Sequence, residues 1–195
     1  MRFLILLVLL CLAMPATASA DTTSKYQNLH KVVRESTTIV PEIQGVDESD
    51  ANQILCLALN IYQEVRSGAP RDRWAVGFVT LNRLKRGIWG SSICAVVWAK
   101  SQFSWTARSI GTLVPSEASA WADAQNKAYL LYREQYTDDP TQGATHFYLA
   151  KIHPGWASKL VARMRIGAHM FARLPGISTL PVVAKIPIVT ASSKF

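Results

Sequence analysis

The sequence predicts a single α+β domain that is mainly helical and carries a small β element. Three observations support this class. Apolar residues recur at three- and four-residue steps in several segments, which is the period of a buried helix face. Gly or Pro follows the first two of these segments and ends them. Segments of β-like composition are confined to residues 145–149 and 160–166, as short extended pieces or a hairpin around residues 153–156.

Residues 1–20 have the three parts of a secretory signal peptide. Met1-Arg2 is positive, residues 3–14 form an apolar core, and Ala18-Ser19-Ala20 is a small-residue cleavage site. The apolar core is short for a membrane span, although an uncleaved anchor is the alternative. We therefore expect a secreted or periplasmic protein that begins at Asp21 and is not stably inserted in a membrane.

The rest of the chain falls into three segments that differ in charge and composition. Residues 21–49 hold five Asp or Glu against three Lys or Arg and few large apolar residues, which predicts a linker or loosely packed N-terminal arm. Residues 50–174 carry a net charge of +7, which suits an anionic partner. Their basic residues are scattered and form no nucleic-acid motif, so we expect no nucleic-acid partner. Residues 175–195 contain three prolines and are predicted to be a C-terminal tail without regular helix.

The first helix of the domain is predicted over residues 54–68, with acids at 47–50 near its start. Its apolar stripe is formed by Ile54, Leu57, Ala58, Ile61 and Val65. Glu64 flanks that stripe at the helix end, where Gly68 and Pro70 stop the helix. A carboxyl at the edge of a core has a raised pKa and can donate a proton, whereas the alternative is a solvated helix residue.

Three further helices follow. The second spans residues 71–85 with Trp74, Phe78 and Leu81 inward and Gly87 as its stop, and a short third spans residues 91–98. Residues 100–112 are irregular. The fourth helix extends from a Ser116 cap to about Gln135, and its apolar face consists of Trp121, Ala124, Ala128 and Leu131.

Candidate binding residues lie in the aromatic segments. Gln102-Phe103-Ser104-Trp105 interleaves aromatic and polar groups, which suits a sugar ring with its apolar face and polar rim; the alternative is a loop pinned by core aromatics. Thr145, His146 and the neighbouring Phe147 could line a groove, although a structural histidine is the commoner case. Trp156 is either a stacking platform or a loop anchor. For residues 165–171 packing is the favoured role.

Metal and thiol chemistry are weakly indicated. His146, His153 and His169 have no zinc-site spacing and no HExxH motif, so a zinc peptidase has little support and no metal or cofactor is expected. The mature chain has two cysteines, Cys56 and Cys94. An exported chain favours a disulfide, but their apolar surroundings equally fit two buried free thiols.

Six segments, in order over residues 54–173, resemble the SleB-type cell wall hydrolases, which include germination enzymes of spore formers and related phage and proteobacterial proteins. The segments are ILCLALNIYQEVRSG with Glu64, AV to LNR at 75–83, SICAVV at 92–97, QFSW at 102–105, GATHF at 143–147 and IGAHMF at 166–171. Two features depart from the family pattern. The usual Glu-Ala-Arg-Gly reads Glu-Val-Arg-Ser, and no peptidoglycan-binding repeat precedes the domain.

The resemblance implies a lysozyme-like, lytic-transglycosylase-like catalytic domain over residues 50–174 that acts at the cell wall and cleaves peptidoglycan glycan strands. The family's catalytic Glu falls on Glu64, and both cysteines stand where members often have cysteine, which favours the disulfide. The family's groove residues fall on Gln102, Phe103, Ser104, Thr145, His146 and Phe147.

The carboxylates favour transglycosylation over hydrolysis. Most glycosidases place two carboxylates across the scissile bond, and no other acid of the domain lies in a motif comparable to that of Glu64. A lytic transglycosylase needs one acid, which protonates the glycosidic oxygen and then deprotonates the muramic C6 hydroxyl to close a 1,6-anhydro ring. The alternatives are a muramidase or glucosaminidase with a second carboxylate such as Asp72, and a non-catalytic wall-binding module.

Overall fold

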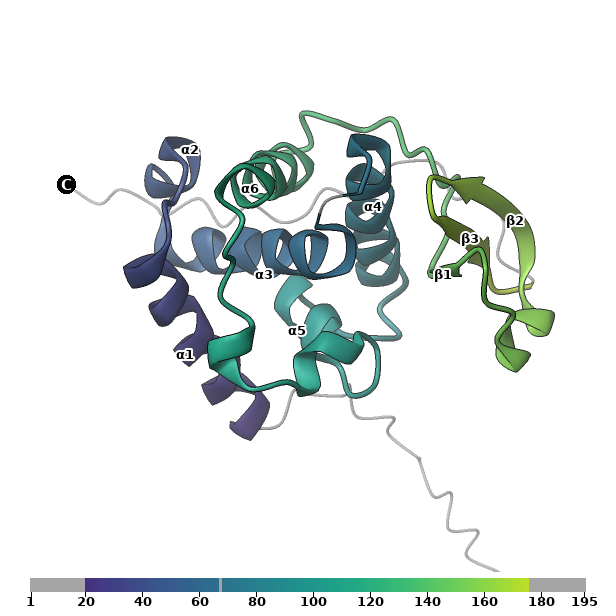
Figure 1. Cartoon of the computed structure of the whole chain (residues 1–195), viewed down its shortest axis with the longest axis horizontal. Coiled ribbons are helices and arrows are strands. Elements are labelled where there is room, and N and C mark those ends of the chain that lie inside the picture. The colour runs from purple at the N-terminus through teal and green to yellow at the C-terminus, as the bar shows by residue number, and fades with distance from the viewer. Residues whose placement is uncertain (1–19, 67, 176–195) are drawn as a thin grey trace, which may run out of the picture.

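The protein is described by a computed structural model that covers residues 20–66 and 68–175. Helices make up most of it, and a three-stranded sheet stands at one end (Figure 1). The predicted mainly helical α+β class is therefore confirmed. The helices are α1 Ala20–Ser36, α2 Pro41–Gln44, α3 Glu48–Val65, α4 Pro70–Arg86, α5 Ile93–Trp98 and α6 Ala118–Tyr132, and the strands are β1 His146–Leu149, β2 Val161–Ile166 and β3 His169–Arg173. Three short 3-10 helices are η1 Ser104–Ala107, η2 Ile110–Thr112 and η3 Gly155–Lys159. Nearly all of the predicted signal peptide and the predicted tail beyond Pro175 lie outside the described residues.

Helix α3 forms the centre of the helical part (Figure 1). Its N-terminus is capped by Asp47, whose carboxylate accepts from the backbone N–H of Asp50 at 3.0 Å. It is apolar over most of its circumference, and it is surrounded by α4, α5 and α6. Its fully buried residues include Ile54, Leu55, Leu57, Leu59 and Ile61. A disulfide between Cys56 and Cys94, with the Cα atoms 5.3 Å apart, joins α3 to α5.

Helix α4 crosses α3 at Gly77, where the two helices and α6 meet. A Cβ atom at Gly77 would lie 2.4 Å from Leu131 Cδ1 and 3.2 Å from Ile61 Cδ1, so a larger residue here would displace the Leu131 side chain. Beside this crossing, the buried Asn60 amide donates to Thr80 Oγ1 at 3.0 Å. The last turn of α3 is thereby fixed near the C-terminal half of α4.

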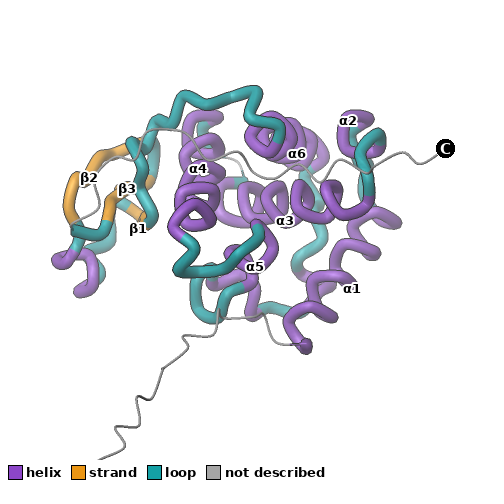
Figure 2. The backbone as a smooth tube through the Cα atoms, turned by 180° about the vertical axis from the view of Figure 1, so that it is seen from behind, coloured by secondary structure: helices purple, strands orange, loops and turns teal. Residues whose placement is uncertain are grey.

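The sheet packs one face against α4 and leaves the other outward. Its order is β1-β3-β2 with antiparallel pairing, and Phe147, Phe171 and Met164 share one cross-strand row. Phe171 in that row packs against Ala75, Val76 and Val79 of α4, and Phe147 and Met164 pack against the same cluster. Figure 2 shows the sheet beside α4 and away from α1.

The possible hairpin between the two predicted β segments is wrong, because β3 lies between β1 and β2 and pairs with both. For residues 165–171 packing was the favoured role. Residues 169–171 also belong to the central strand β3. Its outward face carries the apolar Met170, so the strand lacks the apolar-to-polar alternation that marks a half-exposed strand.

The expectation of a linker or loose arm at residues 21–49 is wrong. Helices α1 and α2 occupy this segment, and Leu29, Val33 and Ile43 are fully or almost fully buried in the main core. Leu29 and Val33 are four residues apart and therefore share a helix face, but the polar residues around them dominate the composition.

The prediction that Ser116 caps the fourth helix is also wrong. Helix α6 begins at Ala118 with Glu117 at the N-cap, and no side chain caps it. The backbone N–H groups of Ser116 and Glu117 instead donate to the Tyr62 hydroxyl of α3, at 3.1 and 3.2 Å. The predicted apolar face of α6, from Trp121 to Leu131, is buried as expected.

Candidate active site

Glu64 lies on the last turn of α3, partly buried, and its carboxyl makes no hydrogen bond within the part of the chain that the structure describes. Burial raises its pKa from the ordinary 4.5 to about 7, against the opposing effect of the Arg83 and Arg108 guanidinium groups. An acid with this pKa is protonated in a large fraction of molecules near neutral pH. It can therefore donate a proton and, once ionised, accept one.

Of the two positive charges that lower the pKa of Glu64, that of Arg83 has the larger effect. Only 5 % of Arg83 is exposed, and its Nε donates to the carbonyl of Thr145 at 2.7 Å. Its guanidinium lies over the rings of Phe103 and Trp89, at 4.9 and 5.4 Å from their centroids. Burial lowers its pKa to about 10, so it stays charged at neutral pH. Its Nη1 is buried and has no hydrogen-bond partner among the residues that the structure describes.

The start of β1 is held beside this arginine by neighbouring polar contacts. Asn82 donates to the carbonyl of Ala144 and to the carboxylate of Asp139, both at 3.0 Å. Asp139 also accepts from the backbone N–H groups of Thr141 and Gly143, at 2.8 Å each. The Asn-Arg pair at the end of α4 thus fixes where Thr145 and His146 enter the site.

His146 begins a row of aromatic side chains on the outer face of the sheet. Burial and the Arg83 charge lower its pKa to about 4, so it is neutral near pH 7, and Thr145 Oγ1 lies 2.9 Å from its Nδ1. Its ring lies 5.8 Å from that of Trp89 and 6.0 Å from that of Trp156. Trp156 is 47 % exposed and lies 5.6 Å from Tyr148. We call Trp89, His146, Trp156 and Tyr148 the aromatic row; such rings suit the apolar faces of sugars.

The residues of the predicted binding segment 102–105 differ in exposure. Gln102 is partly exposed and Ser104 exposed, whereas Phe103 is buried beneath Arg83. Trp105 is 4 % exposed, and its Nε1 donates to Asn60 Oδ1 at 3.0 Å. Trp105 is therefore a core anchor, as the alternative interpretation of this segment held.

Phe147 points away from the aromatic row. Its ring lies 5.6 Å from Phe171 and 5.5 Å from His169, on the side of the sheet that packs against α4. Of the site residues predicted on β1, the structure places Thr145 and His146 next to Arg83 and leaves Phe147 in the packing behind them.

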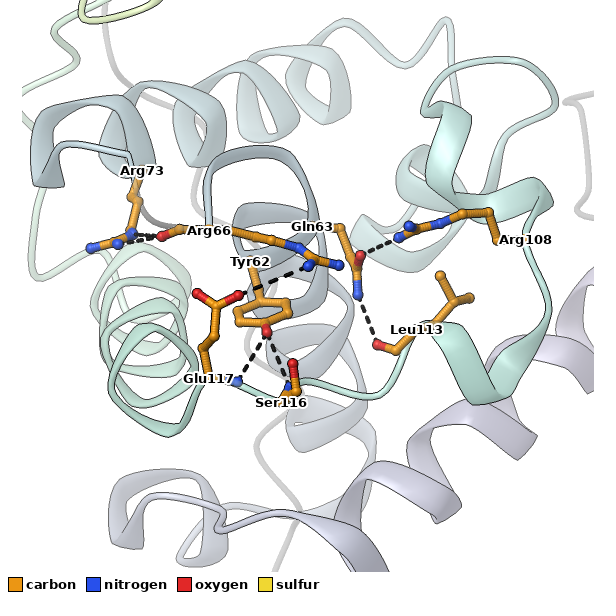
Figure 3. A network of polar contacts seen from close by, with 8 residues as sticks. All are labelled: Tyr62, Gln63, Arg66, Arg73, Arg108, Leu113, Ser116 and Glu117. Atoms are coloured by element: carbon orange, nitrogen blue, oxygen red, sulfur yellow. Dashed lines mark hydrogen bonds and ion pairs between the residues drawn. The ribbon is translucent and has the colours of Figure 1, made fainter.

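Polar contacts fix the end of α3 around Glu64 (Figure 3). Gln63 donates to the carbonyl of Leu113 at 2.7 Å and accepts from Arg108. The carbonyl of Arg66 accepts from Arg73, and the Arg66 guanidinium lies 3.9 Å from the Glu117 carboxylate. Gln63 and Arg66 on either side of Glu64 are thus tied to other elements, which holds the backbone at Glu64 in place.

Sequence reasoning did not assign Arg83, Trp89 or Arg108 to the site. Arg83 was visible only as part of the Asn-Arg pair at a helix end, and Trp89 as a residue after the Gly87 stop. Their roles depend on the crossing of α3 and α4, which no local pattern encodes.

Asp72, the carboxylate named as a possible second acid, makes its contacts at the turn between β2 and β3. It is 2 % exposed, accepts from the backbone N–H of Ala168 at 3.4 Å and lies 4.0 Å from His169 Nδ1. A Cβ atom at Gly167, whose φ is +52°, would lie 2.1 Å from Asp72 Oδ2. Asp72 therefore holds the turn between β2 and β3, and the charges that act on the pKa of Glu64 are both arginines.

A cavity of about 500 Å³ lies on another side of α4. It is lined by Arg71, Trp74, Tyr136, Asp138, Asp139, Pro140 and Gln142. The Trp74 ring is stacked on Tyr136 with centroids 4.0 Å apart, and Lys127 lies 5.2 Å from the Trp74 centroid. The Trp74 ring is therefore in contact with both Tyr136 and Lys127, and none of the predicted site residues lines this cavity.

The described residues contain neither a cluster of metal ligands nor a helix suited to cross a membrane. Within residues 20–66 and 68–175, no three His, Cys, Asp or Glu residues come together in a way that could hold a metal ion. Across the same residues, no helix combines the length and the apolar character that a membrane crossing requires.

Comparison with known proteins identifies the family. The model of a family described as cell wall hydrolase matches residues 69–172. The chain belongs to the cell wall hydrolase family. It is therefore a peptidoglycan-degrading enzyme, as the six segments indicated. The matched range contains Arg83, Phe103 and the Thr145–His146 pair and begins just after Glu64, so the role of Glu64 is argued from its position and environment.

Two solved structures share the fold of this cell wall hydrolase. One is the catalytic domain of the germination-specific lytic transglycosylase SleB from Bacillus anthracis, with 25 % identity, a TM-score of 0.51 and coverage of 69 % of this chain and 100 % of that one. The other is the catalytic domain of the Bacillus cereus SleB protein, with 21 % identity, a TM-score of 0.51 and coverage of 69 % and 98 %. No curated protein sequence matches the chain. The predicted lysozyme-like fold is confirmed.

Proposed function

We propose that this hydrolase is an exported lytic transglycosylase that cleaves the β-1,4 bond between N-acetylmuramic acid and N-acetylglucosamine, with Glu64 as acid and then base. The observation that carries the proposal is the environment of Glu64. Its carboxyl has a pKa near 7 and is flanked by two arginines, and among the described residues no acidic neighbour acts on its pKa. One carboxylate must then perform both proton transfers.

The first step is proton donation. Protonated Glu64 gives its proton to the glycosidic oxygen, and the bond from that oxygen to C1 of the muramic residue breaks. The leaving N-acetylglucosamine gains a free hydroxyl. The Glu64 carboxylate that remains is stabilised by the charge of Arg83, which cannot leave because Thr145, Phe103 and Trp89 hold it.

In the second step the substrate supplies the nucleophile. The Glu64 carboxylate accepts the proton of the muramic C6 hydroxyl while O6 bonds to C1, which closes the 1,6-anhydro ring. Glu64 is thereby protonated again and no water is consumed. A pKa near 7 serves both steps, because neither protonation state is strongly favoured.

Further observations support substrate, mechanism and export. The aromatic row begins beside Arg83 and offers ring faces to successive sugars, with Trp156 the most exposed. The relative from Bacillus anthracis, at 25 % identity, is described as a lytic transglycosylase. The positive, apolar and small-residue parts of residues 1–20 support export.

Mass spectrometry of the products released from purified sacculi by residues 21–195 tests the mechanism. We expect 1,6-anhydromuramic ends from the parent protein and a loss of more than a hundredfold in rate for Glu64→Gln. The exposed Glu48→Gln change at the other end of α3 is the matched control and should leave the rate unchanged. Reducing ends would establish hydrolysis with a second carboxylate. Sedimentation with sacculi without any soluble product would establish a wall-binding module.

A further inference from the structure

The sheet and its connecting loop have a charge unlike the rest of the domain. Residues 146–173, which we call the basic arm, contain five Lys or Arg and no Asp or Glu, whereas residues 50–139 contain ten and eight. The five cations are Lys151, Lys159, Arg163, Arg165 and Arg173. The positive charge of the folded domain is therefore concentrated where the chain forms β1, η3, β2 and β3.

Within the described residues, these cations are not neutralised by the protein. None of the five forms an ion pair with a carboxylate there. Arg163 donates to the backbone carbonyl of Ala157 at 2.6 Å, and Arg165 donates to that of Gly167 at 3.2 Å. Lys151, Lys159, Arg163 and Arg165 are all exposed. The basic arm thus presents free positive charge to solvent.

Strand register places part of this charge on the face that carries the aromatic row. Tyr148 pairs with Met170, and Met170 pairs with Arg165, so these three side chains form one cross-strand row on one face of the sheet. His146 lies two residues before Tyr148 in β1 and shares that face. Arg165 is two strands from Tyr148, which corresponds to about 10 Å.

The loop between β1 and β2 adds a second cation to this face. Trp156 contacts both His146 and Tyr148, which fixes η3 against the aromatic row. Lys159 is three residues after Trp156 in the same 3-10 helix, where residues three apart lie on one side. A glycan strand on the aromatic row would therefore have Lys159 and Arg165 beside it.

The glycan itself has few groups that such cations would select, because its N-acetyl and hydroxyl groups are neutral. The peptide stems that branch from it end in free carboxylates. We propose that the basic arm binds these acidic stems, so that the enzyme prefers glycan strands whose stem carboxylates are intact. This inference rests on the proposed function, since it takes the aromatic row as the place of the glycan.

The test compares native strands with strands whose stem carboxylates have been converted to methylamides by carbodiimide and methylamine. The variant is Lys151→Gln/Lys159→Gln, and the control is Lys31→Gln/Arg34→Gln, which removes the same charge from exposed positions of α1. On native strands we expect the first variant to raise KM about threefold to tenfold with unchanged kcat. On amidated strands its KM should equal that of the parent, and the control should match the parent on both.

Several outcomes would overturn the inference. An equal rise in KM on both kinds of strand would mean that the loop acts on the glycan or on folding, and an unchanged KM on native strands would mean that the arm does not meet the stems. Sedimentation with native and amidated sacculi measures stem binding independently of cleavage. A parent protein that cleaves neither kind of sacculus but binds the native kind through the arm would refute the proposed function and support this inference. Arm-dependent binding to phosphatidylglycerol vesicles, without a preference for native sacculi, would assign the arm to a lipid surface.

Discussion

Replacing Arg83 tests whether the site geometry sets the chemistry of Glu64. Arg83→Met removes the positive charge and keeps an unbranched apolar stem, whereas Arg83→Lys keeps the charge. An opposite charge nearby typically lowers a carboxyl pKa by about 1–3 units. Because Glu64 is partly exposed, we expect Arg83→Met to raise its pKa from about 7 by about one unit.

The assay is the pH dependence of kcat/KM on soluble glycan strands. Activity needs protonated Glu64 in the free enzyme, so kcat/KM should fall as pH rises through its pKa. The alkaline limb should therefore lie near pH 7 for the parent, about one unit higher for Arg83→Met, and near the parent position for Arg83→Lys. The rate itself should fall in Arg83→Met, because the ionised intermediate loses its counter-charge.

One result would refute this reasoning. If Arg83→Met lowers kcat/KM equally at every pH and leaves the limb in place, then Arg83 only supports β1 through Thr145. Should Arg83→Met fail to fold, Arg108→Gln provides the same test from an exposed position, with a smaller shift because Arg108 has the smaller effect on Glu64.

Three further changes test the framework. Gly77→Ala should lower the free energy of unfolding by about 1–3 kcal/mol in urea titrations, because its Cβ would overlap Leu131, whereas Gly111→Ala, with open space around it, should have little effect. Replacing Cys56 and Cys94 together with Ala should lower the free energy of unfolding by about 3–4 kcal/mol, since the disulfide spans 38 residues; equal denaturation midpoints for both proteins would contradict this. Burial lowers the pKa of His30 to about 4, so its stabilising effect is present above pH 6.5 and lost as pH falls toward 4; His30→Gln should flatten that part of the unfolding free energy against pH, measured by thermal unfolding.

The helices were predictable where burial is one-sided or complete. The stripe around Glu64 and the Gly87 stop lie where the structure has them, with Gly87 in the left-handed conformation at φ +65°. The same rule missed α1, because Leu29 and Val33 are its fully buried apolar residues and polar residues dominate the segment around them. It missed β3, because the outward face of this strand carries the apolar Met170 and the expected polar alternation is lost.

The site was predictable only in part. The raised pKa of Glu64 follows from its place at the edge of an apolar stripe, which is visible in the sequence. The Arg83 contact with Thr145 joins residues 62 positions apart and depends on how two helices cross. Phe103 and Trp105 are two residues apart and equally aromatic, yet one contacts the site arginine and the other bonds to Asn60 in the core.

Both polar anchors of the sheet belong to one helix. Asp72, on the first turn of α4, holds the turn between β2 and β3, while Asn82 and Arg83, near its last turn, hold the entry to β1. These positions are 10 residues or more apart, or about 15 Å along the axis. A sheet pinned at two such points cannot hinge on the helix. We therefore expect α4, the sheet and the aromatic row to move as one rigid body, so that any closure over a substrate involves segments outside this unit, such as η1 and η2 beside the end of α3.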